Sequence, residues 1–274
     1  MKISIEQTAW GGLARPERLA RLADAAQSAA ASGCDVLLTP ELSLTGYAVG
    51  DVLARSAEEK DGPLMAAVCK IAARHGIALI VGWVEHDQGT LYNTASCLGP
   101  TGELLAHHRK TVLPPGFEQD IFSPGDGPCL FTLAGVPAAL LICYEAEIAE
   151  GPRAMADAGA HVVFVPTALY AQWASVAERM IPTRAFENSI AIAYANHAGA
   201  EGETAYFGGS SITDPTGELL AWGGPNETRI EAEVNLAMIP ALRRRLPYGA
   251  DAPTLRQRLA SGPADDEWAD RPPN

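Results

Sequence analysis

The chain has 274 residues, a length that fits one large α/β domain or two small ones. Hydrophobic residues make up 47% and charged residues 19%, a balance that excludes an intrinsically disordered chain. The formal net charge of -13 argues against nucleic-acid binding, because phosphate contacts need clusters of Lys and Arg.

Neither the start of the chain nor its apolar runs predict a membrane or export signal. The first residues read as a short strand without the apolar segment of a signal peptide. The longest apolar runs, residues 136–143 and 161–165, are too short to span a bilayer. The five cysteines form no CxxC pair and have no metal-ligand spacing. We therefore expect a cytoplasmic protein with free thiols, no metal site and no membrane partner. No cofactor is expected either.

Hydrophobic periodicity in the first half predicts alternating strands and helices. The expected strands are residues 2–7, 36–40, 77–85, 92–98 and 103–109, and the expected helices are residues 16–32 and 61–75. The first helix carries Leu19, Leu22 and Ala26 on one face, with Gly33 just past its end.

The second half repeats this plan. Strands are expected at residues 136–142, 161–165, 190–196, 210–213, 218–221 and 229–234, and helices at 152–158 and 175–187. Two β-α-β runs of this kind predict an α/β fold with two sheets between helix layers. No linker separates the halves, so we expect one domain over residues 1–260. The acidic residues 261–274 are expected to form a disordered tail.

Three polar or nucleophilic residues stand directly after expected strands. They are Glu41, Lys110 and Cys143. Reactive groups of α/β proteins gather where strands end, so these three are candidates for one site. A carboxylate that accepts the thiol proton, a thiolate that attacks and an ammonium that stabilises an oxyanion together make an acyl-transfer centre.

Each of these residues also has an ordinary structural explanation. A Cys after a strand is usually a small core residue, a Glu there often caps a helix, and a Lys is usually exposed. His107 and His108 precede Lys110 without a Cys or carboxylate at metal-ligand spacing, so metal binding is not expected there. Spacing alone leaves open whether the three candidates meet.

The motifs around these residues resemble the nitrilase superfamily of carbon–nitrogen hydrolases. The resemblance spans about residues 1–255 and keeps the family's order of motifs, which here read Leu37-Leu-Thr-Pro-Glu41, His108-Arg-Lys110 and Leu141-Ile-Cys143-Tyr-Glu. It implies that Glu41 is the general base, Lys110 the oxyanion stabiliser and Cys143 the nucleophile. Glu118, ahead of Phe-Ser-Pro-Gly, matches a second glutamate of the family.

The same resemblance implies a four-layer αββα sandwich that pairs as a homodimer or forms a higher homo-oligomer. It implies an amidase that hydrolyses a small aliphatic amide through a thioester on Cys143, with the backbone N–H of Tyr144 as a second oxyanion donor. Within the superfamily, the segments around residues 194–201 and 207–217 are similar to small aliphatic amidases, including 5-aminopentanamidase and R-stereoselective amidases. This branch favours an amide that bears an amino group.

The segment after the nucleophile departs from that branch. Glu145 stands where an Asp is usual, and both Glu145 and Glu147 are expected on a loop that borders the pocket. Glu147 is a candidate for binding a substrate ammonium, or else a structural partner of Arg153 or Arg184. Tyr47, Tyr144 and Trp173 are the other candidate substrate-binding residues.

Two rival functions remain open from the sequence. A nitrilase or an N-carbamoyl-amine hydrolase would use the same three residues, so pocket shape must separate them from an amidase. A non-catalytic binding protein on the same fold is the rival from another class, and the intact set of Glu41, Lys110, Cys143 and Glu118 weighs against it.

Overall fold

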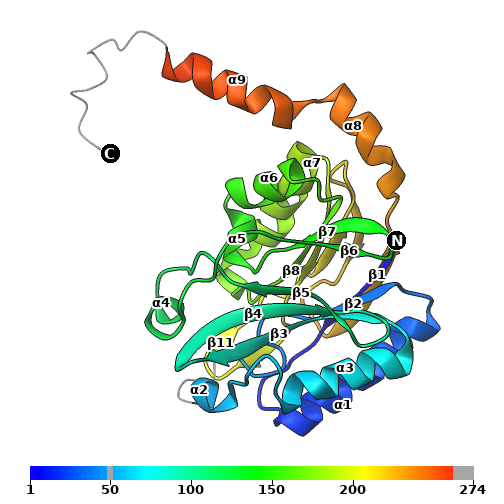
Figure 1. Cartoon of the computed structure of the whole chain (residues 1–274), viewed down its shortest axis with the longest axis vertical. Helices are drawn as coiled ribbons and strands as arrows, with labels where there is room; N and C mark the ends of the chain where they lie inside the picture. Colours follow the sequence, from blue (N-terminus) through cyan, green and yellow to red (C-terminus); the bar gives the residue numbers. More distant parts are fainter. Residues whose placement is uncertain (48–51, 262–274) are drawn as a thin grey trace.

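The computed structural model describes residues 1–47 and 52–261, which form two β-sheets packed face to face between layers of helices (Figure 1). The first sheet has the strand order β14-β1-β2-β3-β4-β5. Its central pairs β1–β2 and β2–β3 are parallel, and the outer pairs are antiparallel. The strands are β1 (Lys2–Gln7), β2 (Val36–Leu38), β3 (Ala78–Asp87), β4 (Thr90–Leu98), β5 (Leu104–Arg109) and β14 (Thr228–Glu233).

The second sheet has the order β13-β12-β9-β8-β7-β6 and the same design. Strands β7, β8 and β9 are parallel, and the outer pairs are antiparallel. The strands are β6 (Cys129–Leu133), β7 (Val136–Leu140), β8 (Val162–Pro166), β9 (Ala191–Ala195), β12 (Ser211–Thr213) and β13 (Leu219–Trp222). A small hairpin, β10 (Ala200–Glu201) with β11 (Thr204–Ala205), lies outside both sheets.

Two pairs of helices cover the outer faces of the sheets. Helices α1 (Arg15–Ala31) and α3 (Pro63–His75) pack on the first sheet, and α6 (Glu150–Asp157) and α7 (Ile181–Asn188) on the second. The shorter elements are α2 (Val52–Ser56), α4 (Phe117–Ile121), α5 (Tyr144–Glu147), the 3₁₀ turns η1 (Ala171–Trp173) and η3 (Leu236–Met238), and the π-helical turn η2 (Val176–Met180). At the end of the described chain, α8 (Ile239–Arg245) and α9 (Tyr248–Ala260) project from the body (Figure 1).

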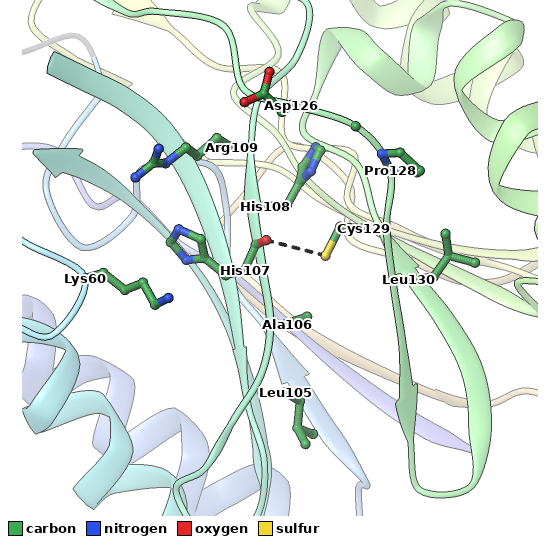
Figure 2. A pocket seen from close by; sticks show the side chains of 11 residues that line it. Lys60, Leu105, Ala106, His107, His108, Arg109, Asp126, Pro128, Cys129 and Leu130 are labelled. Carbon is green, nitrogen blue, oxygen red and sulfur yellow. Dashed lines mark hydrogen bonds between the residues drawn. The ribbon is translucent and has the colours of Figure 1, made fainter. Parts of the chain in front are cut away.

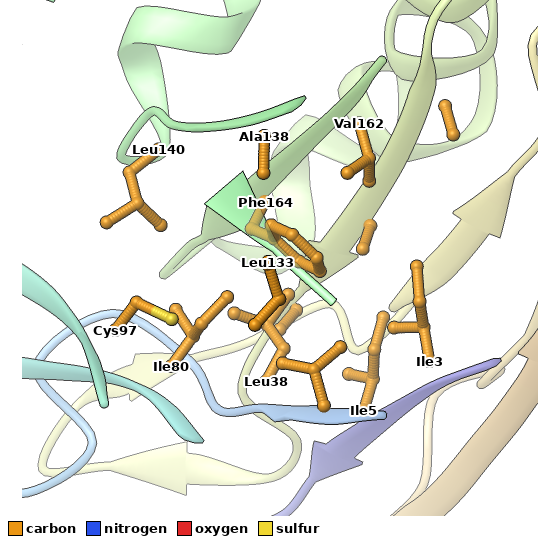
Figure 3. Packing of buried hydrophobic residues seen from close by; sticks show 14 of the residues in the cluster. Ile3, Ile5, Leu38, Ile80, Cys97, Leu133, Ala138, Leu140, Val162 and Phe164 are labelled. Carbon is orange, nitrogen blue, oxygen red and sulfur yellow. The ribbon is translucent and has the colours of Figure 1, made fainter. Parts of the chain in front are cut away.

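The alternation of side chains along the strands explains the layering. In β2, Val36 and Leu38 point toward the second sheet, whereas Leu37 points toward the helices. Leu38 and Ile80 of the first sheet meet Phe164 of the second in a fully buried cluster (Figure 3). Fully burying side chains of this size stabilises the folded state by about 1.5–3 kcal/mol each, and side chains on both faces of each central strand are buried in this way. The expected αββα layering is confirmed.

Some elements differ from the sequence prediction. Strand β6 was not predicted. The helix expected at residues 175–187 is divided into η2 and α7. Helix α9 follows Pro247, and most of the expected acidic tail lies outside the described residues. No helix within residues 1–47 and 52–261 combines the length and apolar character needed to cross a membrane.

Candidate active site

Lys110, Glu41 and Glu118 form a buried triad between the two sheets. The Lys110 Nζ lies 2.8 Å from Glu41 Oε1 and 2.9 Å from each carboxylate oxygen of Glu118. All three side chains are almost completely inaccessible to solvent. The structure thus brings together the lysine and both glutamates that the sequence singled out. The two carboxylates hold the Lys110 ammonium in position and keep it positively charged.

Asn93 and Tyr47 donate further hydrogen bonds to these carboxylates. The Asn93 Nδ2 donates to Glu41 Oε1 at 2.7 Å and to Glu118 Oε2 at 3.2 Å. The Tyr47 hydroxyl donates to Glu118 Oε1 at 2.7 Å. Asn93 was not predicted as a site residue; it is buried in β4 between Tyr92 and Thr94.

The backbone around Glu41 is held by contacts from both sheets. Glu41 N–H donates to Thr167 O at 3.3 Å, and its carbonyl accepts from His197 Nε2 at 2.7 Å. Gly82 of β3 lies directly beneath, where a Cβ would approach Leu42 N to 2.4 Å. A side chain at position 82 would therefore push the Glu41 turn away from the sheet.

Cys143 sits at a sharp turn between β7 and α5. Its φ of 49° and ψ of −110° lie in a region that residues other than glycine rarely adopt. Its N–H donates to Pro166 O at 2.9 Å, next to the Thr167 carbonyl that holds Glu41. The end of β8 therefore holds Cys143 and Glu41 as neighbours.

Burial and charge set the protonation of this site. Burial raises the pKa of the Cys143 thiol well above its ordinary value, and the Glu41 charge adds to this while Lys110 opposes it. Burial also raises the pKa of Glu41 to about 7, against the attraction of Lys110. Burial disfavours the Lys110 ammonium, but Glu41, Cys143 and Glu118 outweigh it and the pKa of Lys110 rises. The free thiol therefore keeps its proton and needs a base to remove it.

Cys143 lines a cavity of about 630 Å³ at the ends of the two sheets. All four expected substrate-binding residues line it, but they differ in exposure: Tyr47 is buried, Tyr144 and Glu147 are half-buried, and Trp173 is 58% exposed at the rim. The remaining lining residues are Pro114, Pro115, Gly116, Phe117, Glu118, Ala168, Leu169 and Tyr170. The sequence did not predict three parts of the pocket wall: the loop with Pro114 and Pro115, Phe117 at the start of α4, and Tyr170 from the loop after β8.

The expectation that Glu145 borders this pocket is wrong. Glu145 is 4% exposed and points away from the cavity, toward the end of β5. His108 also turns inward and contacts Glu145, while His107 lies 2.9 Å from Glu85. Within the described residues, no group of three His, Cys, Asp or Glu side chains is placed to hold a metal ion.

A second depression lies along β5 and β6, outside the cavity at Cys143 (Figure 2). It has a volume of about 540 Å³ and is lined by His107, His108, Arg109 and Cys129 among others. The Cys129 Sγ donates to the His107 carbonyl at 3.7 Å across it. Arg109 is occupied by ion pairs with Glu85 and Asp87. This depression contains no counterpart of the Lys110 triad.

Comparison with known proteins shows the family. Residues 2–244 match the carbon-nitrogen hydrolase family. The chain belongs to that family. It is therefore a hydrolase of carbon–nitrogen bonds other than peptide bonds, within the nitrilase superfamily that the motifs indicated.

The relatives include several amidases. The chain is 34% identical to an (R)-stereoselective amidase of Pseudomonas sp, over 96% of this chain and 93% of the relative. It is 30% identical to a 2-oxoglutaramate amidase of Bacillus subtilis, over 79% of this chain and 84% of that protein. The amidase of Nesterenkonia sp. AN1 matches 90% of this chain and 95% of its own, with a TM-score of 0.82 and 32% identity, in a structure with butyramide. Another structure of that amidase carries the acetamide moiety of fluoroacetamide on its active-site cysteine.

Proposed function

We propose that this hydrolase is an amidase that converts small aliphatic amides to carboxylic acids and ammonia through a thioester on Cys143. The observation that carries the proposal is the pairing of a protonated, buried thiol with a fixed ammonium and a carboxylate that has one free oxygen. Glu41 Oε1 is bound to Lys110 and Asn93, whereas the buried Oε2 has no hydrogen-bond partner among the described residues. An unpaired, buried carboxylate oxygen is suited to accept the thiol proton.

The reaction follows from these roles. Glu41 takes the Cys143 proton as the sulfur attacks the amide carbonyl carbon, and the resulting oxyanion is stabilised by Lys110. The N–H of Tyr144 is a second donor, because it belongs to the first turn of α5 and has no acceptor inside that helix. Glu41 then passes the proton to the departing nitrogen, which leaves as ammonia. Water, deprotonated by Glu41, hydrolyses the thioester and regenerates the thiol. Glu118 holds Lys110 in place.

The dimensions of the cavity support a small substrate, and a substrate panel tests the reaction. A cavity of about 630 Å³ walled by Pro114, Phe117 and Leu169 accommodates a short aliphatic chain. We expect ammonia release from pentanamide at a kcat/KM at least about 100-fold above that for pentanenitrile or N-carbamoylputrescine, corresponding to about 2.7 kcal/mol of transition-state stabilisation. Faster release from the nitrile, or release of carbon dioxide from the carbamoyl amine, would replace the amidase assignment with one of those rivals.

Glu147 supports a finer proposal, that the preferred amides carry an amino group. Its carboxylate lines the cavity and forms no ion pair in the part of the chain that the structure describes. Arg184 instead donates to the Glu147 backbone carbonyl at 2.7 Å and pairs with Glu187. Burial raises the pKa of Glu147 and outweighs the opposing attraction of the Lys110 ammonium, so the nearby charge only partly compensates this carboxylate. A substrate ammonium would supply an ion-pair partner.

Replacing Glu147 with Gln tests this specificity. We expect the KM for 5-aminopentanamide to rise about ten-fold or more while that for pentanamide stays within about two-fold, because a partly desolvated ion pair contributes about 1–3 kcal/mol. Glu150→Gln, an exposed carboxylate three residues along, is the matched control. Equal losses on the charged and the neutral amide would leave the enzyme a general aliphatic amidase.

We also propose that the domain of residues 1–260 pairs as a homodimer through its C-terminal helices. Helix α9 has no buried residue, and Leu255 and Leu259 are 58% and 73% exposed. Such exposed apolar side chains on a projecting helix favour a partner surface. Sedimentation at micromolar concentration should give a dimer for the chain that ends at residue 260 and a monomer for a chain that ends at residue 246. A monomeric full-length chain contradicts the proposal.

The free state of all five cysteines supports a location in the cytoplasm, where thiols stay reduced. Cell fractionation that recovers the protein with a secreted or periplasmic marker would contradict it.

A further inference from the structure

Glu145 stands two residues after the nucleophile but takes no part in the cavity. It lies in α5, is 4% exposed, and directs its carboxylate toward the loop that follows β5. Glu145 is therefore a buried carboxylate immediately behind the catalytic residues, and the reaction proposed above gives it no chemical step.

The Glu145 carboxylate accepts four hydrogen bonds. Its Oε1 accepts from the Thr111 N–H at 2.7 Å and from the Thr111 hydroxyl at 2.5 Å. Its Oε2 accepts from the Ile142 N–H at 2.6 Å and lies 2.9 Å from His108 Nε2. Burial alone would raise the pKa of Glu145, but the hydrogen bonds from His108 and Thr111 outweigh burial and lower it. Glu145 is therefore an ionised acceptor for all four groups.

These four donors come from the two different sheets. Thr111 follows Lys110 at the end of β5 in the first sheet, and His108 belongs to β5 itself. Ile142 precedes Cys143 and follows β7 in the second sheet. His108 also lines the depression along β5 and β6 (Figure 2). One carboxylate thus joins the backbone next to the ammonium with the backbone next to the nucleophile.

We propose that Glu145 is a positioning residue that fixes Lys110 relative to Cys143. The position of Cys143 relative to Glu41 is supported separately, because the backbone N–H groups of both residues donate hydrogen bonds to carbonyls at the end of β8. Loss of the Glu145 contacts should therefore impair oxyanion stabilisation more than deprotonation of the thiol. The strained φ of Cys143 makes such support necessary, since strained residues persist only where their surroundings hold them.

The test is Glu145→Gln, which keeps the size of the side chain but replaces one acceptor oxygen with an NH₂ donor. That donor must face the N–H of either Thr111 or Ile142, so one side of the contact is lost. We expect kcat for amide hydrolysis to fall about 100-fold with KM within about three-fold, as expected for a displacement of about 1 Å in a catalytic group. The rate at which iodoacetamide alkylates Cys143 should stay within about three-fold, because that reaction needs no oxyanion donor.

Thr111→Val gives a second measurement should Glu145→Gln fail to fold. It removes only the hydroxyl donor, so we expect a loss of kcat of about five-fold or more, again without a change in alkylation. Glu150→Gln should match the wild type in both reactions. A folded Glu145→Gln enzyme with kcat within two-fold of the wild type overturns the positioning role, and so does an equal loss of turnover and alkylation.

The inference rests on the proposed amidase function, but the two can fail separately. If the wild type releases no ammonia from any amide, the proposed function is wrong. If the wild type is active and the Glu145 and Thr111 variants keep its kcat, only the positioning role is wrong.

Discussion

Replacement of Cys143 by Ala should abolish amide hydrolysis, with a loss in kcat of roughly 10⁴-fold or more. Removal of a covalent nucleophile leaves only the stabilisation that the oxyanion donors and substrate binding provide. The fold should persist, because Ala keeps the Cβ of Cys143 and leaves the N–H bond to Pro166 O intact. Ammonia release measures the loss, and circular dichroism checks the fold.

Labelling with iodoacetamide gives the complementary measurement. The wild type should lose activity as one equivalent binds, and peptide mass analysis should locate the label on Cys143. Cys69→Ala is the matched control, because Cys69 is a half-buried thiol outside the catalytic cavity. The Cys69 variant should keep full activity and the same labelling. A Cys143→Ala enzyme that retains a tenth of the wild-type activity would rule out Cys143 as the nucleophile.

The three central residues could be predicted as candidates because each closely follows a strand, and their roles were implied by the resemblance to the nitrilase superfamily. Glu41 comes shortly after β2, Lys110 after β5 and Cys143 shortly after β7. Strand periodicity locates these ends, and two sheets packed face to face bring the ends together. The hydrogen bonds that Asn93 and Tyr47 donate to the two glutamates could not be predicted in the same way. Their roles depend on the register between β3 and β4 and on a turn beyond β2, which no local pattern specifies.

The sequence also could not predict which way the side chains after Cys143 point. Glu145 and Glu147 are two residues apart, and the sequence predicts both on one loop that borders the pocket. They belong instead to the short helix α5, where a separation of two residues places side chains on different sides. Glu147 consequently lines the cavity, and Glu145 points to Thr111.

Strand β6 and helix α9 were missed for different physical reasons. β6 is an edge strand that pairs only with β7 among the described strands, and its weak alternation follows a loop rich in Gly and Pro. Helix α9 contains Pro253 and buries no side chain, and its few apolar residues do not give a clear helical period. Periodicity detects elements that pack on a core, and α9 does not pack on the core of its own chain.

Replacement of Glu41 by Gln should lower kcat/KM by about 10³-fold, within the range for loss of a general base. The amide keeps the size of the side chain and can still accept from Lys110 or Asn93, so the fold should persist. It cannot take the proton of Cys143, whose pKa burial raises well above the ordinary value. The alkylation of Cys143 by iodoacetamide should slow together with amide hydrolysis. In Glu145→Gln, by contrast, only amide hydrolysis should slow.

The wild-type pH profile provides an independent check on Glu41. Burial raises its pKa to about 7, and only the carboxylate form can act as the base. The kcat/KM of the wild type should therefore be full above pH 7 and fall as the pH decreases through about 7. The negative charge of Glu118 contributes to the raised pKa of Glu41, so the residual activity of Glu118→Gln should have its acid limb at lower pH. An acid limb that stays near pH 4.5 in the wild type, or does not move in Glu118→Gln, would mean that another group accepts the thiol proton.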